Sequence, residues 1–193
     1  VINERFHVNN DEGCIYEIFG GPMLGMLGLG FLYTNKNSIS IGLGVTLSEL
    51  IEKGIRPYDL LDKLKSHPEI APLIKDGELM EYSAHLIPEG GYKKVPLLFG
   101  AGVMVCGDAA MFVNNMHWEG TNLAMISGKI AGETAVIALG KQDFSETALS
   151  HYQEELENSF IIKDLRTYKD LMGGIQERVE EFLGYYPKKI NSF

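Results

Sequence analysis

Two short polar stretches carry the residue types best suited to bind a ligand. Gly107-Asp108-Ala109 follows the apolar run Val103 to Cys106, and Gly120-Thr121-Asn122 precedes a long apolar helical pattern. A carboxylate at a glycine turn can accept charge-assisted hydrogen bonds from adjacent hydroxyl groups of a sugar or polyol. The glycine removes the side chain that would keep such a ligand away from the backbone. The first stretch therefore predicts a polyol contact at Asp108.

The second stretch adds a different kind of binding group. The first N–H groups of a helix have no partners within the helix, and the helix dipole is positive at that end. Such an end suits an anion or a carbonyl oxygen. A flavin offers a target for each stretch: its ribityl chain for Asp108, and the N1/O2 edge of its ring for Gly120, Thr121 and Asn122. The alternative is that the two stretches are independent turns.

The elements before these stretches read as an antiparallel sheet. Strands are predicted from Cys14 to Phe19, from Phe31 to Thr34 and from Ile39 to Val45, with a hairpin turn at 35–38. The last strand puts only small residues on one face: Ser40, Gly42 and Gly44. We expect another body to approach that face closely, either a covering helix or a ligand ring.

The segment between the first two strands, residues 20 to 30, holds five glycines and no charge. We interpret it as a buried glycine-rich connection. Its leucines and methionines also suit the wall of a site for a flat apolar ligand, or a surface that touches a bilayer.

Helices follow the sheet. Thr46 and Glu49 have the spacing of a capping box, and Gly54 suits the end of that helix. Pro57 and Pro68 each suit the first turn of a short helix. Residues 78 to 87 are predicted to form another strand.

The second half of the chain reads as one buried strand and several helices. The run Val103 to Cys106 lacks alternation, as is typical of a strand buried on both faces. A helix is predicted over 121–139, where Ala124, Gly128 and Gly132 lie at intervals of four residues and indicate close packing against a strand or helix. A further helix should span 149–160, and another 164–184, broken near Gly173-Gly174.

Composition excludes several classes of function. The 193 residues carry a net charge of −9 at a sequence pI of about 5.0, which argues against nucleic acid as a partner. No apolar run long enough for a transmembrane helix and no signal peptide are found. The two cysteines, Cys14 and Cys106, lack metal-ligand spacing and cannot ligate a four-iron cluster.

The pattern GDAA…EGTNLAMISGKIAGETA resembles the second flavin-binding motif of FAD-dependent oxidoreductases with a para-hydroxybenzoate-hydroxylase-like fold. AHLIPEGGY, FLYTNKNSISIGLGV and ENSFIIKDLRTYKD are similar to the electron transfer flavoprotein–quinone oxidoreductase branch, FixC type. The resemblance extends from about Tyr16 to Asp170. It implies that Gly107, Asp108 and Ala109 hold the ribityl and pyrophosphate part of FAD.

The same resemblance places Gly120, Thr121 and Asn122 along the pyrimidine edge of the flavin. Many relatives have a proline between the two motifs, where this chain has Asn115-Met116-His117-Trp118. His117 and Trp118 are therefore expected near the ring, in roles that the resemblance does not define. We expect no catalytic side chain and no metal, because the cofactor carries the redox chemistry.

The resemblance implies an α+β fold with an antiparallel substrate-domain sheet. We expect a substrate or quinone domain over 1–80, the C-terminal part of the FAD domain over 81–140, and a helical segment over 141–193. Gly-x-Gly-x-x-Gly, which binds the ADP half of FAD in this family, follows none of the predicted strands. The chain is thus expected to be the C-terminal half of such a protein, and to hold FAD weakly when isolated.

The implied partners are an electron transfer flavoprotein, a quinone and, since the chain lacks cluster ligands, a separate ferredoxin-like iron–sulfur subunit. Quinone chemistry implies a cytoplasmic protein at the cytoplasmic face of the membrane, with residues 20 to 30 as the candidate contact. Three alternatives remain: a reductase of isoprenoid double bonds, as geranylgeranyl reductases are, an aromatic hydroxylase, and a non-catalytic domain without FAD.

Overall fold

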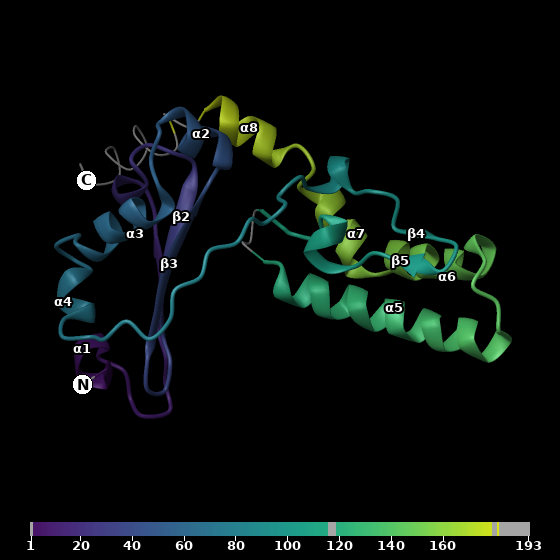
Figure 1. The fold of residues 1–193 in the computed structure, drawn as a ribbon, viewed down its shortest axis with the longest axis horizontal. Helices are drawn as coiled ribbons and strands as arrows, with labels where there is room; N and C mark the ends of the chain where they lie inside the picture. Colours follow the sequence, from purple (N-terminus) through teal and green to yellow (C-terminus); the bar gives the residue numbers. More distant parts are fainter. Residues whose placement is uncertain (1, 116–118, 179–180, 182–193) are drawn as a thin grey trace. The chain divides into compact units, whose positions relative to one another are not determined.

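The computed structural model describes residues 2–115, 119–178 and 181; His117 and Trp118 lie outside the described residues. The chain divides into two compact units, residues 1–82 with 175–193, and residues 83–174. Helices and small antiparallel sheets are mixed, as the predicted α+β class requires (Figure 1).

The first unit is built on a three-stranded antiparallel sheet in the order β1-β2-β3. The strands are β1 (Ile15–Ile18), β2 (Gly28–Thr34) and β3 (Ile39–Val45). The hairpin between β2 and β3 is confirmed, with the Asn35 N–H donating to the Ser38 carbonyl at 2.8 Å. Leu32 pairs with Ile41, so their side chains share one face of the sheet.

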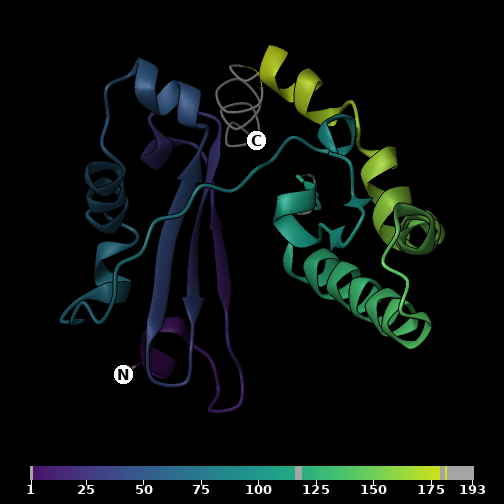
Figure 2. The same cartoon turned by 45° about the vertical axis from the view of Figure 1, so that its right-hand side comes forward.

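Helices cover the face of β3 that carries its branched residues. Leu32 lies in a core with Phe6 of α1 (Ile2–Phe6), Leu64 of α3 (Pro57–Lys65) and Ile70 just before α4 (Ala71–Ile74), and the partly buried Ile39, Ile41 and Leu43 pack against it. Figures 1 and 2 show α3 and α4 on one side of the sheet. At Gly42 the small-residue face is covered by an aromatic ring and not by the predicted helix. A Cβ on Gly42 would lie 2.4 Å from Cζ of the Phe31 ring. The body that approaches Gly42 is therefore an aromatic ring of the neighbouring strand.

The glycine-rich connection is buried, as predicted. It forms a short 3-10 helix, η1 (Gly21–Met23), and then runs into β2. The side chains of Pro22, Met23 and Met26 are buried, the two methionines completely. These three side chains are therefore unavailable for the bilayer contact expected at residues 20 to 30, because they are buried in the unit.

Helix α2 (Leu47–Glu52) begins after Thr46, as the capping-box spacing predicts. The contacts differ from those of a capping box, because the Glu49 carboxylate accepts from the Leu27 N–H at 3.0 Å and from the Thr46 hydroxyl. The Thr46 N–H donates to the Leu27 carbonyl at 3.1 Å. Glu49 thus ties the end of the glycine-rich connection to α2.

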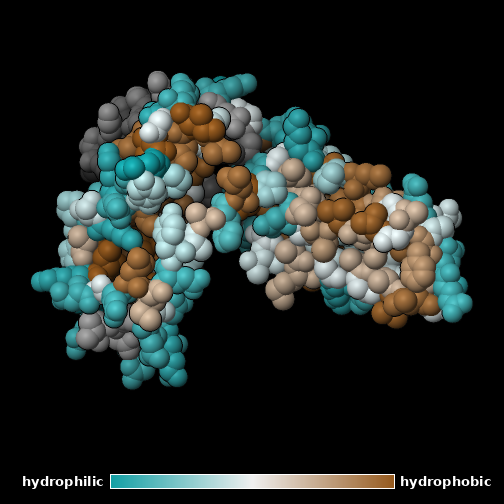
Figure 3. Space-filling model, viewed as in Figure 1, coloured by the Kyte–Doolittle hydropathy of each residue, from teal (hydrophilic) through white to brown (hydrophobic). Residues whose placement is uncertain are grey.

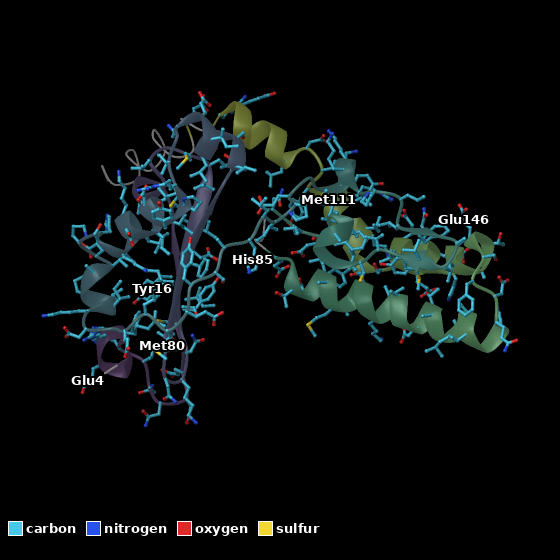
Figure 4. The ribbon with its side chains drawn as sticks, in the orientation of Figure 1. Glu4, Tyr16, Met80, His85, Met111 and Glu146 are labelled. Carbon is cyan, nitrogen blue, oxygen red and sulfur yellow. The ribbon has the colours of Figure 1, made fainter. Side chains whose placement is uncertain are left out.

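Two predictions in this region are wrong. Pro68 lies in a turn, and α4 begins three residues later, with Pro72 in its first turn. The strand predicted over 78–87 is absent: residues 77–91, which include Met80 and His85, have no regular secondary structure (Figure 4). An alternating apolar pattern needs a partner strand to become a β-strand, and no described strand pairs with this segment.

The second unit holds a two-stranded sheet and a stack of helices. Its elements are η2 (Tyr92–Lys94), β4 (Phe99–Gly100), β5 (Val103–Met104), η3 (Gly107–Ala110), α5 (Thr121–Lys141), α6 (Glu146–Asn158) and α7 (Phe160–Thr167). Helix α6 contacts α5, α7 and β4. The core gathers buried side chains from α5, α6 and α7, among them Leu123, Tyr152, Leu156 and Ile161, together with Phe112 from the segment after η3.

Three details of this unit differ from the sequence predictions. Strand β5 pairs only with β4 among the described strands and leaves Val103 54% exposed, so it is not buried on both faces. The last helices break at 168–170, and Gly173 and Gly174 lie inside α8 (Leu171–Glu177). Phe160 begins α7 and is exposed, so the predicted helix over 149–160 ends at Asn158.

Helix α5 confirms the predicted long helix and has an unusual composition for its burial. Contrary to the expectation that no segment could span a membrane, it is long and apolar enough to do so by length and composition alone, with a mean hydropathy of 1.4 over its most apolar window. Only 22% of that window is buried, whereas the core helix of a soluble protein is mostly buried. Apolar residues therefore lie on the outer face of α5 as well as on its inner face.

Candidate cofactor site

The turn at Gly107 follows β5 and begins η3, which packs against helix α5. Gly107 has a φ of +63°, a left-handed conformation that glycine adopts without steric cost. A Cβ on Gly107 would lie 3.3 Å from the Cβ of Ala124 in α5. Glycine is thus required here both by the turn and by the close approach of the helix.

A buried hydrogen bond fixes this turn to the helix. The Gly107 N–H donates to the Ser127 hydroxyl at 3.0 Å, and that hydroxyl donates to the Ala124 carbonyl at 3.1 Å. Ser127 is completely buried. Sequence reasoning missed Ser127, although a polar residue four positions after Leu123, on the core face of an apolar helix, was the available signal.

The side chain of Asp108, which follows the turn, is exposed and therefore accessible to a ligand. Asp108 and Ala109 are exposed, whereas Gly107 and Ala110 are buried. A Cβ on Gly120 would lie 3.4 Å from Oδ1 of Asp108. The structure therefore brings the Asp108 carboxylate beside Gly120, at the start of α5, as the sequence spacing predicts.

The N-terminus of α5 lacks a side-chain cap at its N-cap residue. Gly120 occupies that position and makes no side-chain hydrogen bond. The exposed Asn122 accepts from the Leu123 N–H at 3.0 Å and donates to Glu119 at 3.1 Å. Thr121 is also exposed. The exposed Thr121 and Asn122 thus place the positive end of the helix dipole beside Asp108.

The loop between the two motifs is closed by a small bridge. The Asn114 N–H donates to the Glu119 carbonyl at 2.8 Å, and the Glu119 N–H donates to the Asn114 carbonyl at 3.2 Å. The buried Asn114 also donates to the Asp164 carboxylate through its side-chain amide. These bonds hold the two ends of the loop together and thereby limit the distance between Asp108 and the start of α5.

Helix α6 supports the strand that leads to the turn. The Tyr152 hydroxyl donates to the Val105 carbonyl at 2.8 Å, and the Val105 N–H donates to the Leu98 carbonyl at 2.8 Å. Burial, and secondarily the nearby Cys106 thiol, raise the pKa of the Tyr152 phenol well above its ordinary value. The phenol therefore remains a neutral donor at physiological pH.

These groups define a class of site. A left-handed glycine turn, an exposed carboxylate and a helix N-terminus with glycine at its N-cap position suit a ligand that carries both hydroxyl groups and an oxygen-rich edge or anion, as nucleotide cofactors do. Among the described residues, no group of three or more histidine, cysteine or acidic side chains could hold a metal ion.

Comparison with known proteins identifies the family. The family model "ETF-QO, ubiquinone-binding" matches residues 2–87. The chain is 47% identical over 191 residues to protein FixC of Bradyrhizobium diazoefficiens, covering 98% of this chain and 44% of that protein. It is 41% identical over 172 residues to the probable electron transfer flavoprotein-quinone oxidoreductase YdiS of Escherichia coli, covering 88% and 40%.

A third relative, protein FixC of Rhizobium meliloti, is 47% identical over 192 residues, which are 99% of this chain and 44% of that protein. The chain belongs to the FixC-type family of electron transfer flavoprotein–quinone oxidoreductases, which confirms the resemblance seen in the sequence. It spans less than half the length of these relatives.

Proposed function

We propose that this chain supplies part of the FAD site and the quinone domain of an oxidoreductase that passes electrons from an electron transfer flavoprotein to a quinone. The observation that carries the proposal is the approach of the Asp108 carboxylate to Gly120 at the start of α5. The relatives' names favour electron transfer over isoprenoid reduction and aromatic hydroxylation.

Each group has a distinct role in this proposal. Asp108 would accept hydrogen bonds from the ribityl hydroxyls of FAD. Gly107 and Ala109, which have small or no side chains, would leave room for the ribityl group and the pyrophosphate. Gly120, Thr121 and Asn122 would present the start of α5 to the pyrimidine edge, where a positive dipole favours negative charge. Bound FAD supplies the redox chemistry; the residues of this chain bind it, orient it and set the charge around it.

The partners follow from the same family. The match of residues 2–87 to a ubiquinone-binding model supports a quinone partner for the first unit. The two cysteines of this chain cannot ligate a four-iron cluster, and we propose a ferredoxin-like subunit as a further electron carrier. A lipid-soluble quinone would place the protein at the cytoplasmic face of the membrane.

The test uses a chimera in which this chain replaces the matched residues of Bradyrhizobium FixC. Asp108→Asn keeps the size of the side chain and removes its charge, so we expect the purified chimera to lose most of its flavin. Asp62→Asn, a change of an exposed aspartate in α3, is the matched control and should keep the flavin. Equal flavin content in both variants, measured by absorbance per protein, would refute the assignment of Asp108.

A further inference from the structure

A carboxylate of helix α7 reaches the loop that joins the two motifs of the candidate site. The Asp164 carboxylate accepts a hydrogen bond from the side-chain amide of Asn114, a residue 50 positions earlier in the chain. Asn114 is only 1% exposed. Hydrogen bonds to a charged acceptor are the stronger kind, and water competes little for a buried donor. Asp164 therefore holds one end of the loop that leads to the start of α5.

Asn114 transmits this constraint to the first turn of α5. Its backbone exchanges two hydrogen bonds with the backbone of Glu119, at 2.8 and 3.2 Å. The Glu119 carboxylate accepts from the side-chain amide of Asn122 at 3.1 Å, and the Asn122 side chain accepts from the Leu123 N–H at 3.0 Å. We call these contacts from Asp164 to Asn122 the Asp164 network. It connects α7 to the residues that would face the pyrimidine edge of the flavin.

Helix α7 is a fixed support for this network. Its Ile161, Ile162 and Leu165 are buried in the core of the second unit. The Ser159 hydroxyl caps the helix by accepting from the Ile161 N–H at 3.2 Å. Binding groups are held more precisely by a packed helix than by a loop. Asp164, which directly precedes Leu165, is thus held in place by the packing of its helix.

The neighbouring Asn115 provides a looser support for the same end of the loop. Its side-chain amide donates to the Glu89 carbonyl at 3.1 Å, within residues 77–91, which have no regular secondary structure. The Asp164 network lies at the N-terminal end of α5, whereas the hydrophobic surface that Figure 3 shows over α5 lies along the C-terminal half of the helix. The Asp164 network is thus the firm support at the end of α5 that would meet a ligand.

We propose that Asp164 is a positioning residue for the flavin, which it serves by holding the start of α5 at the pyrimidine edge. This inference rests on the proposed FAD site and adds α7 to it. Asp164 acts through Asn114 and Glu119 and takes no part in the chemistry itself. The positive end of the α5 dipole favours negative charge at that edge, so its position affects both the affinity for FAD and the ease of reducing it.

The first test is Asp164→Ala in the chimera with Bradyrhizobium FixC, which removes the acceptor of the Asn114 amide. We expect the dissociation constant of FAD to rise about tenfold, as for the loss of one charged hydrogen bond. The midpoint potential of the flavin that remains bound should fall, because the dipole of α5 then stabilises the added negative charge less. Fluorescence titration of the flavin-free chimera and reductive titration with reference dyes measure the two quantities. A lower melting temperature with unchanged affinity and potential would overturn the proposal.

A swap of donor and acceptor tests the pair directly. Asn114→Asp alone places two carboxylates side by side, and their repulsion should weaken FAD binding as Asp164→Ala does. Combining Asn114→Asp with Asp164→Asn restores one donor and one acceptor in exchanged positions. The combined variant should therefore recover most of the affinity and the potential of the original chimera. A combined variant that binds FAD no better than Asn114→Asp would refute the pairing, even where Asp164→Ala does not fold.

Asp170→Ala is the matched control. The Asp170 carboxylate also pairs with a residue far away in the chain, Lys93, but its side chain is 69% exposed and it lies outside the Asp164 network. Asp170→Ala should change neither the affinity for FAD nor the potential, and a loss equal to that of Asp164→Ala would contradict the proposal. The FAD site itself fails separately, if Asp108→Asn keeps its flavin. If Asp108→Asn loses the flavin while Asp164→Ala keeps the original affinity and potential, only the role of Asp164 is refuted.

Discussion

The Gly107 N–H donates to the buried Ser127 hydroxyl, and this single bond connects the turn that carries Asp108 to the helix whose N-terminus faces it. The two groups that would bind the flavin come from segments separated by a loop. Their relative position depends on how the turn is held against α5. We therefore expect Ser127 to position the proposed site, although its side chain is itself buried.

Replacing Ser127 by alanine should destabilise the chain by about 1 to 3 kcal/mol, because it leaves the buried Gly107 N–H without an acceptor. Ser150→Ala is the matched control. The Ser150 hydroxyl likewise donates to a carbonyl three residues earlier, at 2.8 Å from Thr147, but Ser150 lies on the partly exposed side of α6. Chemical denaturation should show a smaller loss for Ser150→Ala; equal losses would contradict the role of the Gly107 bond.

The Tyr152 phenol makes a prediction about pH. Its pKa is raised in the folded chain, so the folded state holds this proton more tightly than the unfolded state does. The resulting stabilisation is fully present below the ordinary tyrosine pKa of about 10 and is lost as the pH rises above it. Tyr152→Phe should cost about 1 to 3 kcal/mol at pH 7, by leaving the Val105 carbonyl unpaired.

The cost of Tyr152→Phe should shrink above pH 10, because the original chain alone loses the contribution of this phenol there. Melting temperatures from pH 7 to pH 11 provide the measurement. Tyr58→Phe is the control, since Tyr58 is 46% exposed on α3. A Tyr152→Phe penalty that stays constant over this range would show that burial does not hold the phenol neutral.

Local patterns in the sequence predicted the elements whose determinants are themselves local. The hairpin at 35–38, the start of α2 after Thr46 and the long helix from Thr121 all depend on a few adjacent residues and were predicted correctly. The proximity of Asp108 to Gly120 was also predictable, because a strand end and a helix start flank one short loop.

The sequence predictions that failed concern the packing partners of apolar residues and glycines. Val103 reads as part of a strand buried on both faces, yet β5 pairs only with the two residues of β4 in the described chain. Gly128 and Gly132 indicate close packing, yet they face open space. Both patterns are typical of buried elements, and no described element covers Gly128, Gly132 or the second edge of β5.

Glu49 should stabilise the first unit through its two hydrogen bonds, from the Leu27 N–H and the Thr46 hydroxyl. Glu49→Ala should cost about 1 to 3 kcal/mol, because hydrogen bonds to a charged acceptor are the stronger kind. Glu52→Ala, an exposed position in the same helix, is the control and should change stability by less than about 0.5 kcal/mol. Indistinguishable unfolding curves for the two variants would exclude Glu49 as the tie between α2 and the glycine-rich connection.

Gly107→Ala tests the close approach of the turn to α5. The alanine must adopt a φ of +63°, which costs about 1 to 2 kcal/mol, and its Cβ would also meet that of Ala124 at 3.3 Å. Gly102→Ala is the matched control, because Gly102 has a φ of +75° with no atom within 4 Å of a Cβ. Both variants bear the backbone cost, so the excess loss in Gly107→Ala measures the contact with the helix.

That excess should disappear when the opposing methyl group is removed. Adding Ala124→Gly to the Gly107→Ala variant should restore the stability lost through the contact between the two methyl groups. Glycine also weakens the helix, and the Ala124→Gly single variant measures that separate loss. Thermal unfolding of the single and double variants gives the coupling between the two positions. A coupling near zero would mean that Gly107 is required only for its backbone conformation, and that the helix has room to move away from the turn.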